Sequence, residues 1–390
     1  MKTLVELFSN EPILNLLATR IFKPQKLILV CDEKINKQNI NTINIVLNNW
    51  NLSFINTQAI YTNSADYNDI FNTLEKICQT EDDIVFDLAG GSELMLFACG
   101  VLTKKYNSKS YYINTHDLAF HNVNNCEYLN EKYILPRFRV KDILASAGAK
   151  ITGYYKYRPS KRDTEIGDDI LASWDILWKH PNAWTNQISW FQQALRQSPA
   201  EKVTYSAQKH LKIDHANMTI LNKLKDIGVL TELYEHNGTI HLTFKNAELK
   251  HCFTVQGIWL ELYGFLNAYR LNWFNDVKTS VKIGWTNDYE RNDETKNEID
   301  ILLVKGITPI FVSCKMGMPS ALALSEIKTL STRFGGVLAK TVVLTAKDVC
   351  SGSMAIYNRA KELNIYIIDK KDIDNNNVAN RLMEIATTFN

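Results

Sequence analysis

The stretch that decides the fold of this chain runs from Asn297 to Lys315 and reads NEIDILLVKGITPIFVSCK. Its two apolar runs are rich in Ile, Leu, Val and Phe and are joined by a short turn around a glycine, so they predict a pair of antiparallel strands. Because successive side chains alternate between the faces of a strand, this turn places Asp300 opposite Ser313 and Glu298 opposite Lys315. One face of the hairpin then holds two carboxylates and an ammonium.

The opposite face of the predicted hairpin is apolar and would hold the polar cluster against a core. It is expected to present Ile299, Ile301, Leu303, Ile310, Val312 and Cys314. Charged groups beside buried strands are usually paired or bound to a metal ion. An Asp and a Lys at strand ends can equally form a solvent-exposed rim of little energetic value, so both interpretations stay open for the hairpin alone.

The composition indicates a globular protein of two or three domains, with 390 residues of which 45% are hydrophobic. The 44 basic and 42 acidic residues nearly cancel to a net charge of +2, so any nucleic-acid partner would need a local patch of basic residues.

Seven scattered cysteines without a C-x-x-C pair, and no secretory leader, favour a reducing compartment and hence the cytoplasm. No uncharged apolar run reaches the roughly 18 residues of a membrane helix, and ungrouped histidines argue against zinc.

The first part of the chain alternates predicted strands with predicted helices, which is typical of a parallel sheet covered on both faces. The strands are expected at residues 3–8, 26–31, 83–88 and 111–114, with the third strand of the series beginning at residues 52–56. Ligands of such sheets bind beyond the carboxyl ends of the strands. Two loops at those ends are candidates for ligand binding: residues 9–12 after the first strand and residues 89–93 after the fourth.

These two loops have polar and glycine residues that suit an anion. Ser9 or Asn10 is expected to cap the first helix, and Gly90 and Gly91 would let backbone N–H groups approach a ligand at the start of the next helix. A tight turn with Ser92 as helix cap explains the second loop equally well. The chain has no G-x-G-x-x-G sequence, so an ordinary NAD site is disfavoured.

The fourth strand, followed by Gly90-Gly91-Ser92-Glu93-Leu94-Met95, resembles the CRISPR-associated Rossmann fold (CARF) domain. In that family the two loops line a pocket at the axis of a dimer, and the pocket receives a cyclic oligoadenylate. Serine at position 92 stands where the family often has threonine, which keeps the hydroxyl. The resemblance implies that the residues near the phosphates or riboses are Ser9, Asn10, Gly90, Gly91 and Ser92.

The middle of the chain reads as helices followed by a hairpin. A basic run around Pro159 indicates a linker or, less often, a nucleic-acid contact. An amphipathic helix over residues 218–228 precedes a hairpin with its turn at His236-Asn237-Gly238, and this order resembles a winged helix. Such a unit could read DNA or act as a spacer, and the weakly basic helix favours the spacer. The many tryptophans of this region predict core or inter-domain packing.

The last part of the chain begins with a predicted helix over residues 255–270, which contains Glu261. Its buried stripe is expected to comprise Ile258, Trp259, Leu262, Phe265, Leu266 and Tyr269. A strand, the hairpin, a helix over residues 320–335 and a further strand follow. This α-β-β-β-α-β order, with the acids and Lys315, resembles the PD-(D/E)xK nuclease core over roughly residues 253–370.

The nuclease resemblance implies a metal-dependent active site. Asp300, Glu261 and Glu298 would bind Mg²⁺ or Mn²⁺, with the backbone carbonyl of Cys314 completing the ligands. Lys315 would orient the attacking water or offset negative charge. Ser313 occupies the position where the family has an acid, which is a departure from the pattern.

The sequence therefore predicts an α/β protein with a Rossmann-like CARF domain (1–150), a linker or winged-helix-like domain (151–250) and a restriction-endonuclease-like domain (251–390). The combination resembles the CARF-nuclease effectors of type III CRISPR immunity. It implies a cytoplasmic homodimer, activated by a cyclic oligoadenylate such as cyclic tetra-adenylate. The implied substrates are single-stranded RNA and DNA, with nicking of duplex DNA as a further activity. The alternative is a ligand-gated DNA-binding transcription regulator with a degenerate nuclease domain.

Overall fold

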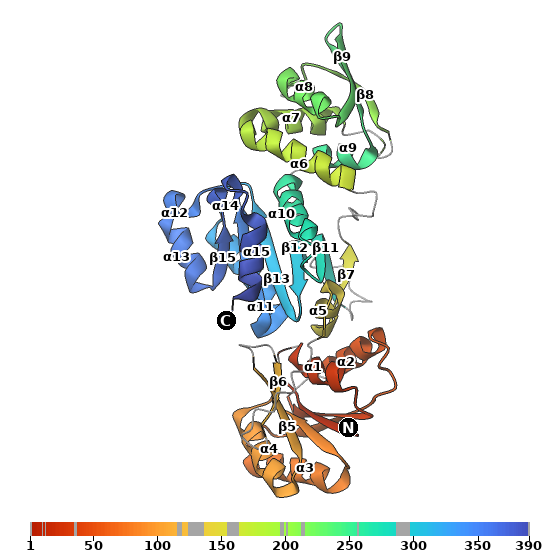
Figure 1. Ribbon diagram of the computed structural model, residues 1–390, viewed down its shortest axis with the longest axis vertical. Coiled ribbons are helices and arrows are strands. Elements are labelled where there is room, and N and C mark those ends of the chain that lie inside the picture. The colour runs from red at the N-terminus through yellow and green to blue at the C-terminus, as the bar shows by residue number, and fades with distance from the viewer. Residues whose placement is uncertain are drawn as a thin grey trace.

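The computed structural model describes residues 2–9, 11, 13–34, 37–114, 119–123, 136–153, 164–195, 199, 202–211, 215–255, 257–285 and 297–388. These residues form two six-stranded sheets and one three-stranded sheet. Figure 1 shows the C-terminal sheet in the centre, with the N-terminal sheet at one end and the middle domain at the other.

The N-terminal sheet has the strand order β3-β2-β1-β4-β5-β6, in which only the β5–β6 pair is antiparallel. Its strands are β1 (Thr3–Leu7), β2 (Lys26–Asp32), β3 (Asn56–Thr62), β4 (Ile84–Asp87), β5 (Lys109–Asn114) and β6 (Ala119–Asn122). Helices α1 (Leu14–Phe22) and α2 (Lys37–Asn49) pack on one face, and α3 (Tyr67–Thr80) and α4 (Glu93–Tyr106) on the other. The predicted parallel sheet with helices on both faces is confirmed.

The third strand begins later than predicted, at Asn56 instead of Leu52. Leu52 and Ile55 are buried, but they pack in the turn after α2, and β3 pairs with β2 from Asn56 onward. Their apolar character reflects burial beneath a helix, which a short apolar run does not distinguish from a strand.

The middle domain combines four helices with a three-stranded antiparallel sheet of order β8-β10-β9. Its elements are α6 (Thr164–Lys179), α7 (Pro181–Ala194), β8 (Thr204–Gln208), α8 (Met218–Asp226), β9 (Leu230–His236), β10 (Thr239–Phe244) and α9 (Ala247–Thr254). Asn237 and Gly238 both have positive φ angles, 48° and 73°, as a two-residue hairpin turn requires. The hairpin is therefore where the sequence predicts it, whereas β8 was not predicted. The basic run around position 159 lies outside the described residues.

The C-terminal sheet has the order β15-β14-β13-β12-β11-β7. Its strands are β7 (Ala149–Gly153), β11 (Asp276–Trp285), β12 (Asn297–Lys305), β13 (Thr308–Lys315), β14 (Lys340–Thr345) and β15 (Ile365–Ile368). The helices around it are α5 (Val140–Ser146), α10 (Ile258–Arg270), α11 (Ala321–Gly335), η1 (Gly336–Leu338), α12 (Val349–Gly352), α13 (Met354–Glu362), α14 (Lys370–Asp374) and α15 (Val378–Thr387). Helices α10 and α15 share one core with this sheet, and α11 belongs to the core on its other face. The predicted domain boundary at residue 150 falls inside β7.

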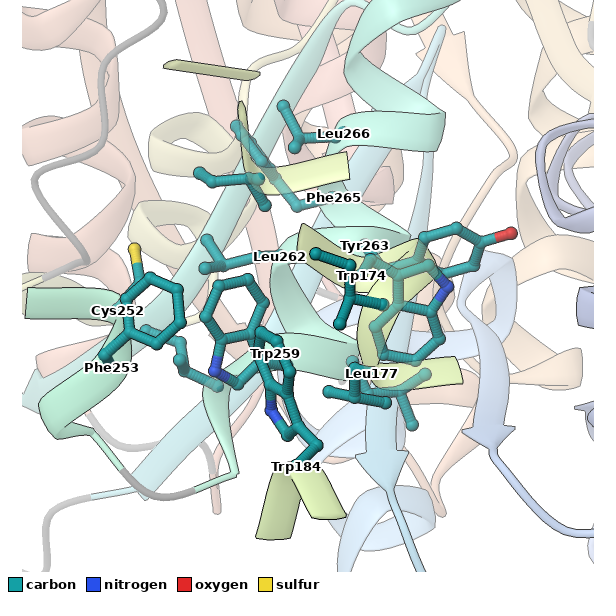
Figure 2. Packing of buried hydrophobic residues seen from close by; sticks show 14 of the residues in the cluster. Trp174, Leu177, Trp184, Cys252, Phe253, Trp259, Leu262, Tyr263, Phe265 and Leu266 are labelled. Atoms are coloured by element: carbon teal, nitrogen blue, oxygen red, sulfur yellow. The ribbon is translucent and has the colours of Figure 1, made fainter. Parts of the chain in front are cut away.

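Helix α10 begins three residues later than predicted, because Gly257 precedes it with a φ angle of 82°. Tyr269 is 39% exposed instead of buried, whereas the other residues of the predicted stripe are buried. An aromatic cluster joins α10 to the middle domain: the rings of Trp184 and Trp259 meet edge to face, and Trp174 stacks on Tyr263 at 4.4 Å between ring centroids (Figure 2). The tryptophans thus contribute to inter-domain packing, as predicted.

Helix α5 connects the N-terminal sheet to the C-terminal one. The indole Nε1 of Trp50, just after α2, donates to Asp142 Oδ1 at 2.9 Å, and the Trp50 ring stacks on Phe138. The backbone N–H of Phe138 in turn donates to the carbonyl oxygen of Gly306 at 3.0 Å. The β12–β13 turn therefore faces the N-terminal sheet, and Asp300 lies toward the opposite end of the hairpin.

Candidate functional site

The hairpin of β12 and β13 has the register that the sequence predicts. The paired residues run from Lys305 with Thr308 to Ile301 with Val312. Continued by one residue, this register places Asp300 opposite Ser313, and the Ser313 hydroxyl donates to Asp300 Oδ2 at 3.3 Å.

The side chains do not keep the predicted strict alternation between the two faces. Ile301 and Leu303 pack in the core with α10, whereas Ile299 packs with Leu302 in the core on the other face. The expectation that Ile299 shares a face with Ile301 is therefore wrong. The physical reason lies in the neighbouring strand: β11 has an irregularity at Ser280, whose φ angle is 49°, directly across from this point of β12.

Two carboxyl groups meet where the strands change faces. Asp300 Oδ2 accepts a hydrogen bond from the backbone N–H of Cys314 at 2.6 Å. Glu261, in the first turn of α10, accepts one from the Ser280 hydroxyl through Oε2 at 2.8 Å. Helix α10, strand β11 and the hairpin thus each contribute one part of the site.

Glu261 and Asp300 are partly buried carboxyl groups, and the negative charge of Asp300 disfavours ionisation of Glu261. Burial and then the charge of Asp300 raise the pKa of Glu261 to about 8, against the lowering effect of the Ser280 hydrogen bond. Burial also raises the pKa of Asp300, while the Cys314 N–H and the Lys315 charge lower it. A nearby cation would relieve this repulsion, because opposite charge favours the ionised form of a carboxyl group.

The predicted ligand set is only partly assembled. The structure brings Glu261, Asp300 and Lys315 within electrostatic reach of one another, whereas Glu298 is exposed and contributes a smaller effect on Glu261. Within the described residues, no group of three or more His, Cys, Asp or Glu side chains is arranged to hold a metal ion. Two carboxylates suit Mg²⁺ or Mn²⁺, which are commonly held by one or two carboxylates, waters and substrate phosphates. Burial raises the pKa of the Cys314 thiol, so the thiol is not a reactive group.

The two N-terminal loops lie in contact with each other. A Cβ on Gly90 would lie 2.2 Å from the carbonyl oxygen of Leu7 and 3.0 Å from Cβ of Ser9. Gly91 has a φ angle of 85°, which favours glycine. Ser92 caps α4 by accepting from the N–H of Met95 at 3.3 Å. Ser9, Gly90, Gly91 and Ser92 are therefore brought together, and Asn10 lies outside the described residues.

Asn15 holds the first of these loops in place, and the sequence analysis did not single it out. Its Oδ1 accepts from the backbone N–H of Ser9 at 2.8 Å, and its Nδ2 donates to the Ser9 carbonyl at the same distance. Helix α1 has Ile13 as its N-cap without a side-chain hydrogen bond, so the expectation that Ser9 caps α1 is wrong, while the same expectation for Asn10 falls outside the described residues. Ser9 is engaged by Asn15 and accepts from the N–H of Glu11 instead.

The N-terminal sheet and its two loops agree with one known family. Residues 3–142 match the family model of the Card1 CARF domain. No curated protein matches the chain.

Two solved structures share the fold over the whole chain, each at 15% identity, which shows the fold alone. They are VC1899 from Vibrio cholerae (TM-score 0.78, covering 100% of this chain and 99% of that one) and Can2 from Sulfobacillus thermosulfidooxidans in complex with cyclic tetra-adenylate (TM-score 0.70, 100% of both). A type III CRISPR defence DNA nuclease activated by cyclic oligoadenylate is similar over 88% of this chain and 45% of its own (TM-score 0.50, 12% identity). The described part of the chain has no helix long and apolar enough to span a membrane.

The N-terminal domain contains a buried acid pair beneath the two loops, which no local sequence pattern indicates. Glu6 on β1 and Asp87 on β4 are paired residues of neighbouring strands, and both are fully buried. Burial and the adjacent Asp87 raise the pKa of Glu6 well above its usual range, and burial raises that of Asp87 to about 7. As ionised groups, neither Glu6 oxygen nor Asp87 Oδ2 would have a hydrogen-bond partner, so a proton shared between the two carboxyls is favoured. Asp87 Oδ1 accepts from the N–H of Ala89, which places the pair directly under the glycine loop.

We expect Glu6→Gln to make the stability of the protein less dependent on pH. A carboxyl whose pKa is raised in the folded state contributes stability that is fully present at about pH 4 and is lost as the pH rises toward 7. Glutamine removes one titrating group and gives Asp87 a permanent N–H donor, so the variant should be more stable than wild type at pH 8 by about 1 kcal/mol. Urea unfolding at pH 5.5 and 8 measures the difference. The exposed Asp82→Asn serves as control, and equal pH dependence of wild type and Glu6→Gln would contradict the shared proton.

Proposed function

We propose that this protein is a metal-dependent nuclease of type III CRISPR defence that is activated by a cyclic oligoadenylate. The observation that supports the nuclease best is the meeting of Glu261, Asp300 and Lys315 beside the hairpin, where burial raises the pKa of both carboxyl groups and the charge of Asp300 further raises that of Glu261. The CARF domain match and the cyclic tetra-adenylate bound by Can2 support the activator. The division at residues 150 and 250 and a cytoplasmic location remain predictions.

The activator is proposed to bind over the two contacting loops of the CARF domain. Gly90 and Gly91 let the backbone approach a ligand closely, because no Cβ stands in the way. Ser9 and Ser92 bring hydroxyl groups to the same place, and Ser92 begins α4, whose first N–H groups favour a phosphate. Cyclic tetra-adenylate is the proposed ring, and Asn10 remains a predicted contact.

The chemistry proposed for the hairpin site is hydrolysis of a phosphodiester bond. Asp300 and Glu261 would hold Mg²⁺ or Mn²⁺ through carboxylate oxygens, and the metal would make a water nucleophilic and stabilise charge on the phosphate. The Cys314 N–H fixes Asp300 Oδ2, and the Ser280 hydroxyl fixes Glu261. The ammonium of Lys315, whose charge reaches both acids, would orient the water and offset negative charge. Glu298 and the Cys314 carbonyl remain predicted additional ligands.

The proposed substrates are single-stranded RNA and DNA, with nicking of duplex DNA as a further activity. The net charge of +2 gives no strong global attraction to a duplex. Recognition would therefore depend on local contacts near the cleaved phosphate.

We propose that the protein acts as a homodimer in which the activator binds across two CARF domains. Helix α4 presents an exposed apolar stripe with helical spacing: Leu94 is 39% exposed, Phe97 63% and Val101 40%. Burying such a stripe against a second copy would stabilise a dimer.

Phe97→Glu is therefore expected to shift the protein from dimer to monomer and to weaken activator binding by at least about 10-fold, since a buried unpaired charge opposes association. Sedimentation velocity and activator titration measure both effects. Phe54→Glu is the matched control, because Phe54 is 64% exposed but lies outside the stripe. A Phe97→Glu variant that remains a dimer would contradict this interface.

The activator loop also contacts the C-terminal domain. Glu11, two residues after Ser9, accepts a hydrogen bond from the backbone N–H of Val337 at 2.7 Å through Oε2. Val337 lies in η1, directly after α11, and α11 begins beyond the end of β13 that contains Lys315. This contact supports gating, and because a ligand shifts an equilibrium only by its differential affinity for two states, we expect low activity without activator.

Cleavage of fluorescent single-stranded RNA and DNA tests the proposed function. The reaction contains Mn²⁺, with and without cyclic tetra-adenylate. We expect cleavage that rises steeply with the activator and disappears when EDTA removes the metal. Activator binding without cleavage of any nucleic acid would contradict the nuclease.

A second candidate is a ligand-gated DNA-binding transcription regulator with a degenerate nuclease domain. Ser313 in the usual acid position, and the lack of a three-acid metal group among the described residues, favour it. It predicts sequence-specific duplex binding through the middle domain and no cleavage.

A further inference from the structure

Ser280 has an unusual backbone conformation for its place in the fold. Its φ angle is 49°, in the left-handed region that costs a residue with a Cβ on the order of 1 kcal/mol. The other non-glycine residues with positive φ angles in the described part of the chain lie in turns or at the ends of elements, whereas Ser280 lies inside strand β11. Strain kept within a strand often serves a nearby functional site.

The strand changes faces at this serine. Val277 packs against the core that contains α10, whereas Val281 and Ile283 belong to the core on the other face. In a regular strand these three positions would share one face. The pairing of β11 with β12 runs on both sides of Ser280 but omits its pairing with Asp300, and Ile299 and Ile301 also point to opposite cores. The register is the same before and after Ser280, so no residue is inserted, and the left-handed backbone of Ser280 marks a kink at which both strands change faces at the level of Asp300.

The side chain of Ser280 contacts the second acid of the site. Its hydroxyl donates to Glu261 Oε2 at 2.8 Å, and this hydrogen bond lowers a pKa that burial and Asp300 raise. One residue thus affects the placement of both acids: its backbone through the kink opposite Asp300, and its hydroxyl through Glu261.

We propose that Ser280 is a positioning residue that sets Glu261 and Asp300 to receive one divalent cation. This inference rests on the proposed function, since it assumes that the two carboxylates hold Mg²⁺ or Mn²⁺. Hydrogen-bond partners of metal-binding side chains commonly affect metal affinity by 10-fold to 100-fold. The alternative role of Ser280 is a purely structural kink of the strand, for which the hydroxyl has no importance.

Two substitutions distinguish the effect of the Ser280 hydroxyl from that of its backbone conformation. Ser280→Gly adopts the positive φ angle without steric cost but lacks the hydroxyl. Ser280→Asn also tolerates the left-handed region and retains a hydrogen-bond donor. Binding of Mn²⁺ to each protein without substrate is measured by the loss of the free-ion electron paramagnetic resonance signal, with thermal unfolding of the metal-free proteins alongside.

We expect Ser280→Gly to weaken Mn²⁺ binding by about 10-fold with an unchanged unfolding temperature, and Ser280→Asn to restore binding to within about 3-fold of wild type. Wild-type Mn²⁺ affinity in Ser280→Gly would overturn the positioning role while leaving the proposed nuclease intact. If wild type binds no Mn²⁺ and cleaves nothing, the proposed function itself fails, and the inference fails with it.

Discussion

Asp300→Asn is expected to lower activator-dependent cleavage on the order of 10³-fold, because it removes the negative charge through which Asp300 would hold the metal ion. The asparagine oxygen can still accept the hydrogen bond of the Cys314 N–H, so the hairpin should remain folded. Since burial raises the pKa of Asp300, the ionised group opposes folding without metal. The unfolding temperature of the metal-free variant at pH 8 should therefore equal or exceed that of wild type.

The measurement combines initial cleavage rates with cyclic tetra-adenylate titration. Activator affinity should be unchanged, because the two loops belong to the N-terminal domain, whereas Asp300 lies in the C-terminal sheet, toward the end of the hairpin that is away from the N-terminal sheet (Figure 1). Glu362→Gln makes the same change of charge at an exposed residue of α13 and should retain wild-type activity. Full cleavage by Asp300→Asn would show that the metal, if one is needed, is held elsewhere.

Gly90→Ala is expected to destabilise the CARF domain by about 3 kcal/mol and to weaken activator binding by at least 10-fold. The added Cβ would lie 2.2 Å from the Leu7 carbonyl oxygen, far inside van der Waals contact, so the loop after β4 must move away from the loop after β1. This movement separates the groups proposed to bind the activator.

Gly100→Ala is the matched control for this experiment. Gly100 lies in α4 of the same domain, and its Cβ would meet nothing within 4 Å. Alanine in a helix is more stable than glycine by roughly 0.5–1 kcal/mol, so this variant should be as stable as wild type or more so. Urea unfolding and activator titration distinguish the two variants, and a Gly90→Ala protein with wild-type behaviour in both would show that the two loops need no close contact.

Local patterns were sufficient for much of the fold. The turn at Gly306 and the apolar runs beside it determine a register that brings Asp300 to Ser313. Five of the six residues predicted for the buried stripe of α10 are buried, as their helical spacing indicates. These features depend on residues close together in the sequence, so pattern alone was enough.

The remaining features depend on contacts between distant residues or on backbone conformations without a sequence signal. Glu6 stands in an apolar strand, and its partnership with Asp87 follows only from the adjacency of β1 and β4. Serine at position 280 gives no signal in the sequence, so neither its left-handed backbone nor the change of faces at Ile299 could be anticipated. Strand β7 pairs with β11, although the whole middle domain separates the two strands in the sequence. No local pattern indicates this pairing.

The position of β7 has a consequence for synthesis on the ribosome. The CARF sheet is complete once β6 has emerged, whereas β7 must wait for β11, which begins at Asp276. At about 5–20 residues per second, that interval lasts on the order of ten seconds, during which the middle domain is made and can fold. Before β11 is made, β7 has no partner strand and could pair with other nascent chains. Its short length of five residues and its lysine and glycine disfavour such pairing. The C-terminal sheet therefore assembles last, after both the CARF domain and the middle domain are available to support it.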